Sequence, residues 1–503
     1  MTTAILLLSH GAIGAVALLT LLLRPPWRAR VLTGLCLVGA GFGVALVVSN
    51  GSSDDWRTAE LGGTSALVGI SIATAWLSAA LVSGRRGSVL SCALIGVASS
   101  AMALAVTNKW AVPMLLFWLC SSLAIAALAA HQRSGLWVWA VLFASDAALV
   151  AALVGSWAET RSWVLPEALE GWPFYVLLLS AALRAGVMPA TGAWSLSREA
   201  APAIPLLVGG GFSLLRIGLG DADPWAGVAL FILALAMSGA VLLARRRAGG
   251  IPAAAAPAIA VMLGLAVIAP SALIAAGLAA VVSAGTAAMW AFSADEAAPD
   301  RVIALTAIPP SLAFLAAVNG VVAAVGRTAG AEEVIDKVPW TLALLLGPLV
   351  LTANVAVAVR IALSLPNGSG WIGRARKLES AALAVLLSRL LLAFAVVATL
   401  LPGDWLGIRS PFAQWEERRT ILLGVALVLG AVATWFAARR PTPSAEHGVS
   451  SSHPRFSPAP WLADPPSGVL AVRLLVGAAL VFAVATIAVV GWFVFEGLRL
   501  GFL

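Results

Sequence analysis

Apolar runs of about 20 residues alternate along this chain with short polar or Gly- and Pro-containing stretches. A helix of roughly 20 apolar residues crosses the hydrocarbon layer of a bilayer. The runs are too long and unbroken for the alternating strands of a barrel, so they predict an all-α polytopic membrane protein. A proline cuts the seventh run short, and the tenth and eleventh lie close enough to fuse. The sixteen candidate spans lie near residues 4–23, 31–48, 64–84, 88–106, 110–130, 136–157, 172–190, 202–220, 225–244, 251–269, 271–293, 303–325, 339–363, 379–401, 420–438 and 469–494.

Composition supports this prediction. Hydrophobic residues make up 61% of the 503 residues and charged residues 11%, and the mean hydropathy is +0.99. A soluble domain is about half apolar and about a quarter charged. These values exclude a water-soluble enzyme, a disordered or fibrous chain and a disulfide framework.

The positive charge indicates orientation. The net charge is +8, but the basic residues are scattered between apolar runs, which indicates loops at a membrane surface and not a nucleic-acid site. With the N-terminus outside, the inner loops hold twice as many Lys and Arg as the outer loops. We therefore predict a multi-pass protein of the inner (plasma) membrane with both termini outside. The first run lacks a basic leader and a cleavage site, which favours a retained span.

One long linker interrupts the succession of spans. It is rich in Pro, Ser and His, which is typical of a flexible cytoplasmic tether. The expected organisation is N-terminal helices at 1–106, a core with two broken helices at 107–325, C-terminal bundle helices at 326–440, the linker at 441–468 and a final helix at 469–503.

Two spans are broken by helix-disrupting residues. Gly186 and Pro189 interrupt the seventh, and Pro309 and Pro310 interrupt the twelfth. Five spans separate these helices, so they run in opposite directions, as in an inverted-repeat transporter whose pathway lies at the breaks. The alternative is that Gly and Pro are simply more frequent in membrane helices than in soluble ones.

Three ionisable residues within spans are candidates for function. Asp146 lies near the middle of the sixth span, and Arg184 on the seventh is its obvious partner. The two form either part of an ion pathway or a pair that locks two helices together. Arg389, on the fourteenth span, is interpreted as packing against a carbonyl group, or as an anion or lipid contact.

Signals for soluble chemistry are lacking in the sequence. Cys36, Cys92 and Cys120 are far apart and have no zinc or iron–sulfur spacing. Acidic clusters at 54–60 and 295–300 lack the loop spacing of a calcium site. No phosphate-binding loop, dinucleotide fingerprint or nucleophile elbow is present. We therefore expect no catalytic residue, metal or cofactor in this chain.

Four segments carry a resemblance to a known family. AALRAGVMPATGAWSLSREAAPAIPLLVGGG (181–211), PPSLAFLAA (309–317), LCSSLAIAAL (119–128) and FASDAALVAAL (143–153) occur in the order and spacing of the corresponding helices in that family. On these motifs the chain resembles the antiporter-like subunits of respiratory complex I and the Mrp-type cation/proton antiporters. The resemblance implies an inverted-repeat core that contains the broken helices 7 and 12, within a proton- or cation-translocating assembly of several membrane subunits.

The chain departs from the family at the residues to which proton movement is attributed there. The family's helix-5 glutamate is missing, and its helix-7 lysine aligns with Arg184. The helix-8 histidine region has become Gly209, Gly210 and Gly211, and the helix-12 lysine falls near Ala317. An arginine side chain, with a pKa above about 12, does not release its proton in proteins. A locking role for Asp146 and Arg184 is therefore favoured, because no further titratable residue continues the path.

The resulting hypothesis is an antiporter-like subunit whose own proton-relay lysines are largely lost. Three alternatives remain open: a stand-alone secondary transporter, the membrane subunit of an inorganic-carbon uptake system, and a structural anchor. The anchor would recruit a soluble partner at the cytoplasmic face through the linker and the basic inner loops. No nucleic-acid partner is expected.

Overall fold

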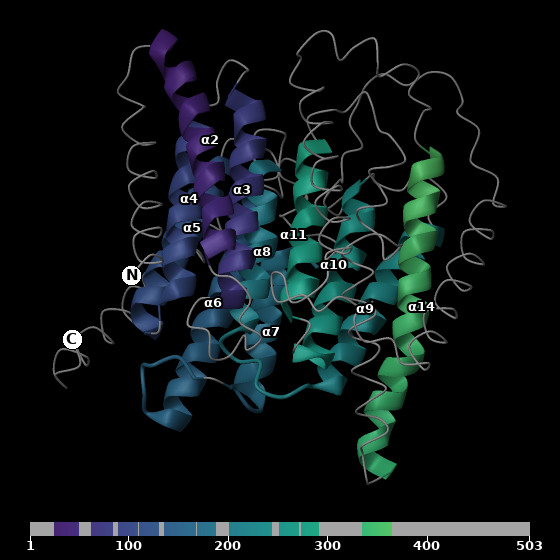
Figure 1. Ribbon diagram of the computed structural model, residues 1–503. Helices are drawn as coiled ribbons and strands as arrows, with labels where there is room; N and C mark the ends of the chain where they lie inside the picture. Colours follow the sequence, from purple (N-terminus) through teal and green to yellow (C-terminus); the bar gives the residue numbers. More distant parts are fainter. Residues whose placement is uncertain are drawn as a thin grey trace, which may run out of the picture.

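The computed structural model describes residues 25–49, 62–83, 89–108, 110–129, 135–166, 168–187, 201–243, 251–270, 273–290 and 334–364. These residues form an all-helical bundle (Figure 1), as the apolar runs predict. The α-helices are α2 (Pro25–Ser49), α3 (Gly62–Ser83), α4 (Val89–Thr107), α5 (Ala111–Ala129), α6 (Gly135–Thr160), α7 (Trp172–Ala185), α8 (Ile204–Leu215), α9 (Pro224–Leu243), α10 (Ile251–Ile268), α11 (Leu273–Trp290) and α14 (Val334–Ser364). A 3₁₀ turn, η3 (Ala201–Ala203), leads into α8.

Each of these α-helices falls on one of the predicted spans. The tenth and eleventh spans are two separate helices, α10 and α11, which pack against each other. The seventh and eighth spans give helices of only 14 and 12 residues. The predicted spans near 4–23, 303–325, 379–401, 420–438 and 469–494 lie outside the described residues, as does the linker at 441–468.

Helix α8 lies at the centre of the bundle (Figure 1). It packs against α3, α4, α7 and α11, and all of its residues are buried. It begins with a proline in its first turn, a position where the missing amide hydrogen leaves no helical bond unmade. Helices that follow each other in the chain pack against each other, as α4 does with α5 and α6 with α7. The core therefore forms between helices around α8.

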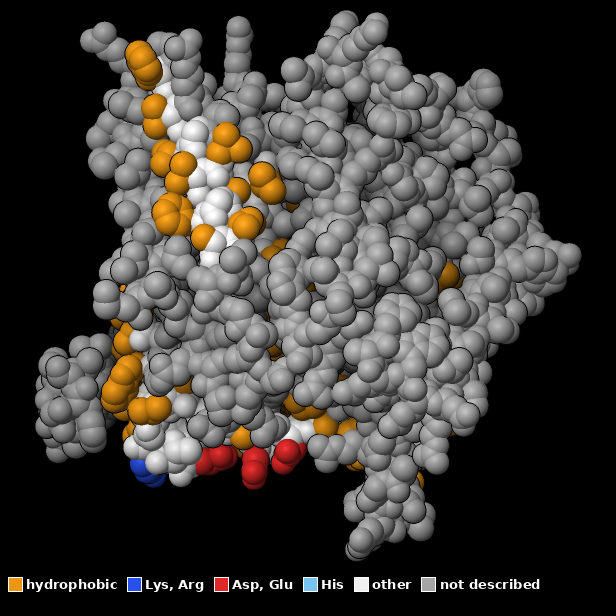
Figure 2. All heavy atoms as spheres, viewed as in Figure 1, with side chains coloured by type: hydrophobic (Ala, Val, Ile, Leu, Met, Phe, Trp, Pro, Cys, Tyr) orange, Lys and Arg blue, Asp and Glu red, His pale blue; other side chains and the backbone are white. Residues whose placement is uncertain are grey.

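Several described helices have the properties of membrane spans. Segments of α5, α6, α9 and α14 are long and apolar enough to cross a bilayer. Exposed aromatic side chains lie at the first turns of α5, α7 and α9, where Trp and Tyr of membrane proteins meet the headgroups; they are Trp110, Trp172, Tyr175 and Trp225. Among the described residues, which Figure 2 colours by type, apolar side chains lie along the face in view and the charged ones lie at one end. That end therefore marks a membrane–water boundary.

The helices on the α9 side of the bundle pack through small residues. A Cβ added at Gly264 of α10 would lie 2.8 Å from Cε1 of Phe231 on α9. A Cβ added at Gly227 of α9 would overlap the side chain of Ile268 on α10. Small residues let helix backbones approach closely, which is how membrane helices gain van der Waals contact. The α9–α10 contact therefore depends on shape.

Candidate functional site

Asp146 and Arg184 form a buried ion pair between α6 and α7. The Arg184 Nη1 atom lies 3.2 Å from Oδ1 of Asp146. Arg184 is 1% exposed and Asp146 5% exposed. A buried charge is costly unless it is paired and hydrogen-bonded, so each side chain offsets part of the desolvation cost of the other.

Helix α5 completes the site with two hydroxyl groups. Ser122 Oγ accepts a hydrogen bond from Arg184 Nη1 at 2.6 Å and donates to Asp146 Oδ1 at 3.0 Å. Ser121 Oγ accepts from Arg184 Nη2 at 3.4 Å. The Ser122 hydroxyl thus bridges the two charges. Three helices, α5, α6 and α7, contribute to one hydrogen-bonded cluster.

Trp118 contacts both charges from the same face of α5. Its Nε1 donates to Asp146 Oδ1 at 3.1 Å. The Arg184 guanidinium carbon lies 4.0 Å from the centroid of the indole. A cation over an aromatic face is attracted by the ring quadrupole, and more strongly where water is excluded. Trp118, Ser121 and Ser122 are spaced i, i+3 and i+4, which places them on one side of a helix. We call these three residues, Asp146 and Arg184 the arginine cluster.

A second polar contact joins α6 to α7 close to the arginine cluster. Ser145 Oγ donates to the Ser180 carbonyl at 2.9 Å, and Ser180 Oγ donates to the Ser145 carbonyl at 2.7 Å. Both serines are fully buried. Ser145 precedes Asp146, and Ser180 lies one turn before Arg184. The reciprocal bonds therefore fix the register in which the two charges meet.

The glycine triplet of α8 allows close packing around the cluster. A Cβ at Gly210 would lie 3.2 Å from Arg184 Nε and 3.3 Å from Cη2 of Trp118. A Cβ at Gly211 would lie 2.6 Å from the Ala181 carbonyl oxygen, and one at Gly209 would overlap Ser71 of α3. Side chains at these positions would push α8 away from α7 and α3. Glycines stand where the resembled family has a histidine, and they allow the backbone of α8 to lie close to its neighbouring helices.

Helix α7 ends at Ala185, directly before Gly186. Gly186 adopts a left-handed conformation, with φ 78° and ψ 31°. Its backbone amide donates a hydrogen bond to the carbonyl of Leu183, in the last turn of the helix. Glycine adopts this conformation without the strain that a Cβ brings, and it commonly follows the last helical residue. Arg184 therefore sits in the last turn of α7. Pro189, Pro309, Pro310 and Arg389 lie outside the described residues.

The chemistry of the cluster is that of a fixed charge pair. Arginine keeps its proton, so Arg184 holds an anionic partner but does not pass a proton by titrating. Its Nε is buried and has no hydrogen-bond partner among the described residues. Within that part of the chain, no group of three or more His, Cys, Asp or Glu side chains is placed to hold a metal ion.

The contributions of α5 were not predicted from the sequence. Asp146 and Arg184 form the predicted pair, whereas Trp118, Ser121 and Ser122 were not among the predicted site residues. Their spacing on one face of an otherwise apolar helix is a usable signal, because buried hydroxyl and indole N–H groups need partners. Arg216 was missed as well. It follows the last residue of α8, and its Nη1 donates to the Val106 carbonyl at 2.7 Å.

Comparison with known proteins identifies the fold. No protein-family model matches the chain, and no curated protein matches it. Its structure is similar to a chain of respiratory complex I from Thermus thermophilus, with a TM-score of 0.55 and 18% identity, over 80% of this chain and 98% of that chain. It is also similar to a chain of the membrane-bound sulfane sulfur reductase, an archaeal respiratory membrane complex, with a TM-score of 0.56 and 14% identity, over 98% of this chain and 94% of that chain.

This chain therefore has the fold of chains found in respiratory membrane complexes. The resemblance to complex I that the four sequence motifs indicate is confirmed at the level of the fold. Together with the span-like helices, the shared fold defines a multi-pass, all-helical membrane protein.

Proposed function

We propose that this chain is an antiporter-like membrane subunit of an ion-translocating respiratory assembly, and that its own proton-relay residues are largely replaced by a fixed charge pair. The shared fold supports the first part, because both similar structures are chains of respiratory membrane complexes. The arginine cluster supports the second part. In place of the family's relay lysines, the cluster holds one carboxylate paired with an arginine, together with an indole and two hydroxyl groups.

The observation that carries this proposal is the enclosure of Arg184. The position that aligns with the family's helix-7 lysine holds a guanidinium that is bonded to Asp146 and Ser122 and stacked on Trp118. A lysine suited to relay changes its protonation state, whereas Arg184 stays charged and its neighbours are arranged around that charge. Asp146 and Arg184 thus lock α6 and α7 to α5.

The proposal includes the wider layout predicted from the sequence. It has sixteen spans, an inverted repeat centred on breaks at Gly186 and Pro189 and at Pro309 and Pro310, both termini outside, and a place in the inner (plasma) membrane. In this arrangement the partners are other membrane subunits. Ions then pass through those subunits, or through water and partner residues at their contact with this chain.

Purification from native membranes tests the subunit assignment. A chromosomally tagged chain, extracted in mild detergent, is expected to co-purify with other multi-pass proteins in fixed stoichiometry. Recovery as a stable monomer contradicts the proposal and favours a stand-alone transporter. A single zinc-containing soluble partner favours the inorganic-carbon alternative. Soluble partners with no other membrane subunit favour the anchor.

A further inference from the structure

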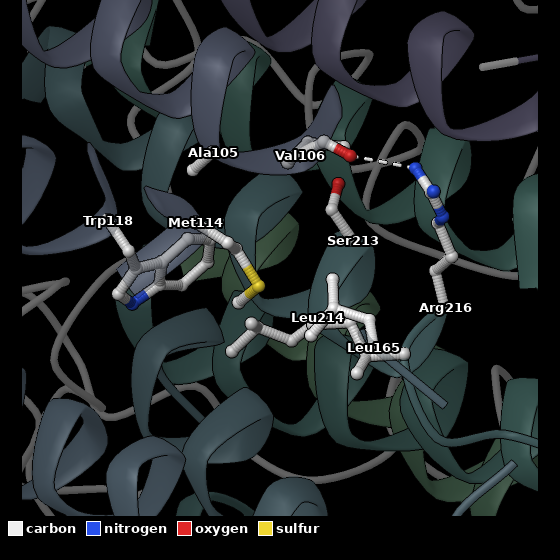
Figure 3. Close-up of a pocket in the computed structure, with 9 residues that line it drawn as sticks. Ala105, Val106, Met114, Trp118, Leu165, Ser213, Leu214 and Arg216 are labelled. Atoms are coloured by element: carbon white, nitrogen blue, oxygen red, sulfur yellow. Dashed lines mark hydrogen bonds between the residues drawn. The ribbon is translucent and has the colours of Figure 1, made fainter. Parts of the chain in front are cut away.

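A small cavity lies beside the arginine cluster, toward the end of the bundle that carries the exposed charges. It has a volume of about 10 Å³ and lies between the C-terminal turn of α4, the start of α5, the end of α8 and Leu165 of the α6–α7 connection. A cavity of this size is at the threshold for holding one water molecule. Figure 3 shows the side chains that line it.

The cavity wall supplies the polar partners that a water molecule requires. The Ser213 hydroxyl donates to the Gly209 carbonyl at 2.7 Å and keeps its acceptor lone pairs. The Val106 carbonyl accepts from Arg216 Nη1 at 2.7 Å and has a second lone pair. Figure 3 shows Ser213 beside this Arg216–Val106 hydrogen bond. A water molecule needs two to four polar partners, roughly what this wall offers.

Trp118 separates the cavity from the buried charge. The indole lines the cavity and also lies beneath the Arg184 guanidinium, at 4.0 Å. Along α8, Gly210 lies one turn before Ser213 and presents no side chain toward Arg184 Nε. Arg184 Nε has no hydrogen-bond partner among the described residues. The position that a Cβ on Gly210 would take lies 3.3 Å from Cη2 of Trp118 and 3.6 Å from the sulfur of Met102. The edge of the indole, with the Met102 side chain beside it, therefore closes the way along α8 from Ser213 to that nitrogen.

We propose that this cavity is a water vestibule for the arginine cluster, and that the Trp118 indole is the gate that keeps water from Arg184. When the Trp118 ring moves aside, the space beside Gly210 opens and water reaches the unpartnered Nε atom of Arg184. The inference concerns access to the charge pair, and it holds whichever partners the chain assembles with.

Accessibility of introduced cysteines to the silver ion, a small hydrated thiol reagent, tests the vestibule. The background is the full chain in sealed vesicles, with Cys36, Cys92 and Cys120 replaced by Ala. Ser213→Cys is expected to react with silver and to lose later labelling by a fluorescent maleimide in denaturant. Ser180→Cys, in the hydroxyl pair between α6 and α7, is the matched buried control and is expected to keep its labelling. An unreactive Ser213→Cys overturns the vestibule.

A second pair of variants tests the gate. Ser121→Cys is expected to be protected while Trp118 is present and to react with silver once Trp118→Ala is added. Reaction with Trp118 in place overturns the gate, and so does continued protection after its removal. Exposure of Ser180→Cys in the Trp118→Ala background reveals a loss of fold. In that event Trp118→Leu, which removes the aromatic ring but keeps a large apolar side chain, replaces Trp118→Ala, and the same outcomes decide.

Discussion

The two sides of the bundle hold together by different means. Between α5, α6 and α7, hydrogen bonds and an ion pair connect the helices: Asp146 and Arg184 with Ser122, and Ser145 with Ser180. Between α9 and α10, the contact consists of an aromatic ring and an aliphatic side chain fitted against glycines. Helices α9, α10 and α11 contain no ionisable residue at all.

The difference shows how a membrane helix pair acquires a defined register. Shape alone allows close approach, and van der Waals contact supplies the energy in an apolar solvent. Hydrogen-bonded groups add a penalty for every wrong register, because a polar group moved off its partner stays unsatisfied. The polar side therefore depends on a few specific atoms, whereas the apolar side depends on volume.

The largest loss of stability is expected from a substitution on the polar side, at Arg184. Arg184→Gln removes the charge that offsets buried Asp146, and breaking one member of a buried pair costs about 3–5 kcal/mol. We expect a large fall in the melting temperature of the purified protein or failure to assemble, measured by thermal unfolding in detergent.

Two further measurements with the same variant sharpen this prediction. Adding Asp146→Asn to Arg184→Gln is expected to recover part of the loss, since neither charge is then left alone. Measurement of proton flux in proteoliposomes can contradict the locking role. A selective loss of flux with unchanged assembly and melting temperature would show that the pair relays ions and does not lock helices.

On the apolar side the sensitive change is one of volume. Gly264→Ala places a methyl group 2.8 Å from the Phe231 ring, and overpacking of this kind costs about 1–3 kcal/mol. We expect a moderate fall in the melting temperature. Phe231→Leu in the same chain is expected to restore part of it by making room. An unchanged melting temperature for Gly264→Ala would mean that this contact is not tightly packed.

Hydrogen bonds between α6 and α7 are expected to contribute less than the charge pair. Ser180→Ala removes the hydroxyl that donates to the Ser145 carbonyl, and interhelical hydrogen bonds in membranes average about 0.6 kcal/mol. Thermal unfolding of Ser145→Ala, Ser180→Ala and the double variant gives the coupling between them. Strict additivity of the two single changes would contradict a cooperative contact.

The smallest effect is expected at a glycine with open space around it. A Cβ at Gly239 of α9 meets no atom within 4 Å. Gly239→Ala is therefore expected to leave the melting temperature unchanged or raise it slightly, because alanine is favoured over glycine in a helix by about 1 kcal/mol or less. It is the matched control for Gly264→Ala, and a fall as large as that of Gly264→Ala would remove the packing explanation.

The helices were predictable from the sequence because a bilayer imposes a simple rule of length and polarity. The predicted spans 225–244 and 251–269 differ from α9 and α10 by at most one residue at either end. The short seventh and eighth helices follow the rule less well. α7 ends before a glycine in a left-handed conformation, and every residue of α8 is buried by protein.

The partnership of Asp146 and Arg184 was also open to prediction, because charges inside a membrane protein seek partners. The rest of the arginine cluster was not identified. Ser121 and Ser122 resemble any small residues in a membrane helix, and a tryptophan in such a helix is commonly taken for a lipid contact. The spacing of Trp118, Ser121 and Ser122 marks one face of α5, but the helix that this face meets depends on how α5 packs against its neighbours. That information is absent from the sequence of a single helix.

The complete burial of α8 has a consequence for biogenesis. A 12-residue helix is about 18 Å long, which is well short of the roughly 30 Å needed to cross the hydrocarbon by itself. One of its neighbours, α11, is synthesised only after α9 and α10. The segment therefore leaves the ribosome before all the helices that surround it have been made. It can pack in its final position only after the later helices are inserted, or with an insertion factor that binds it until then.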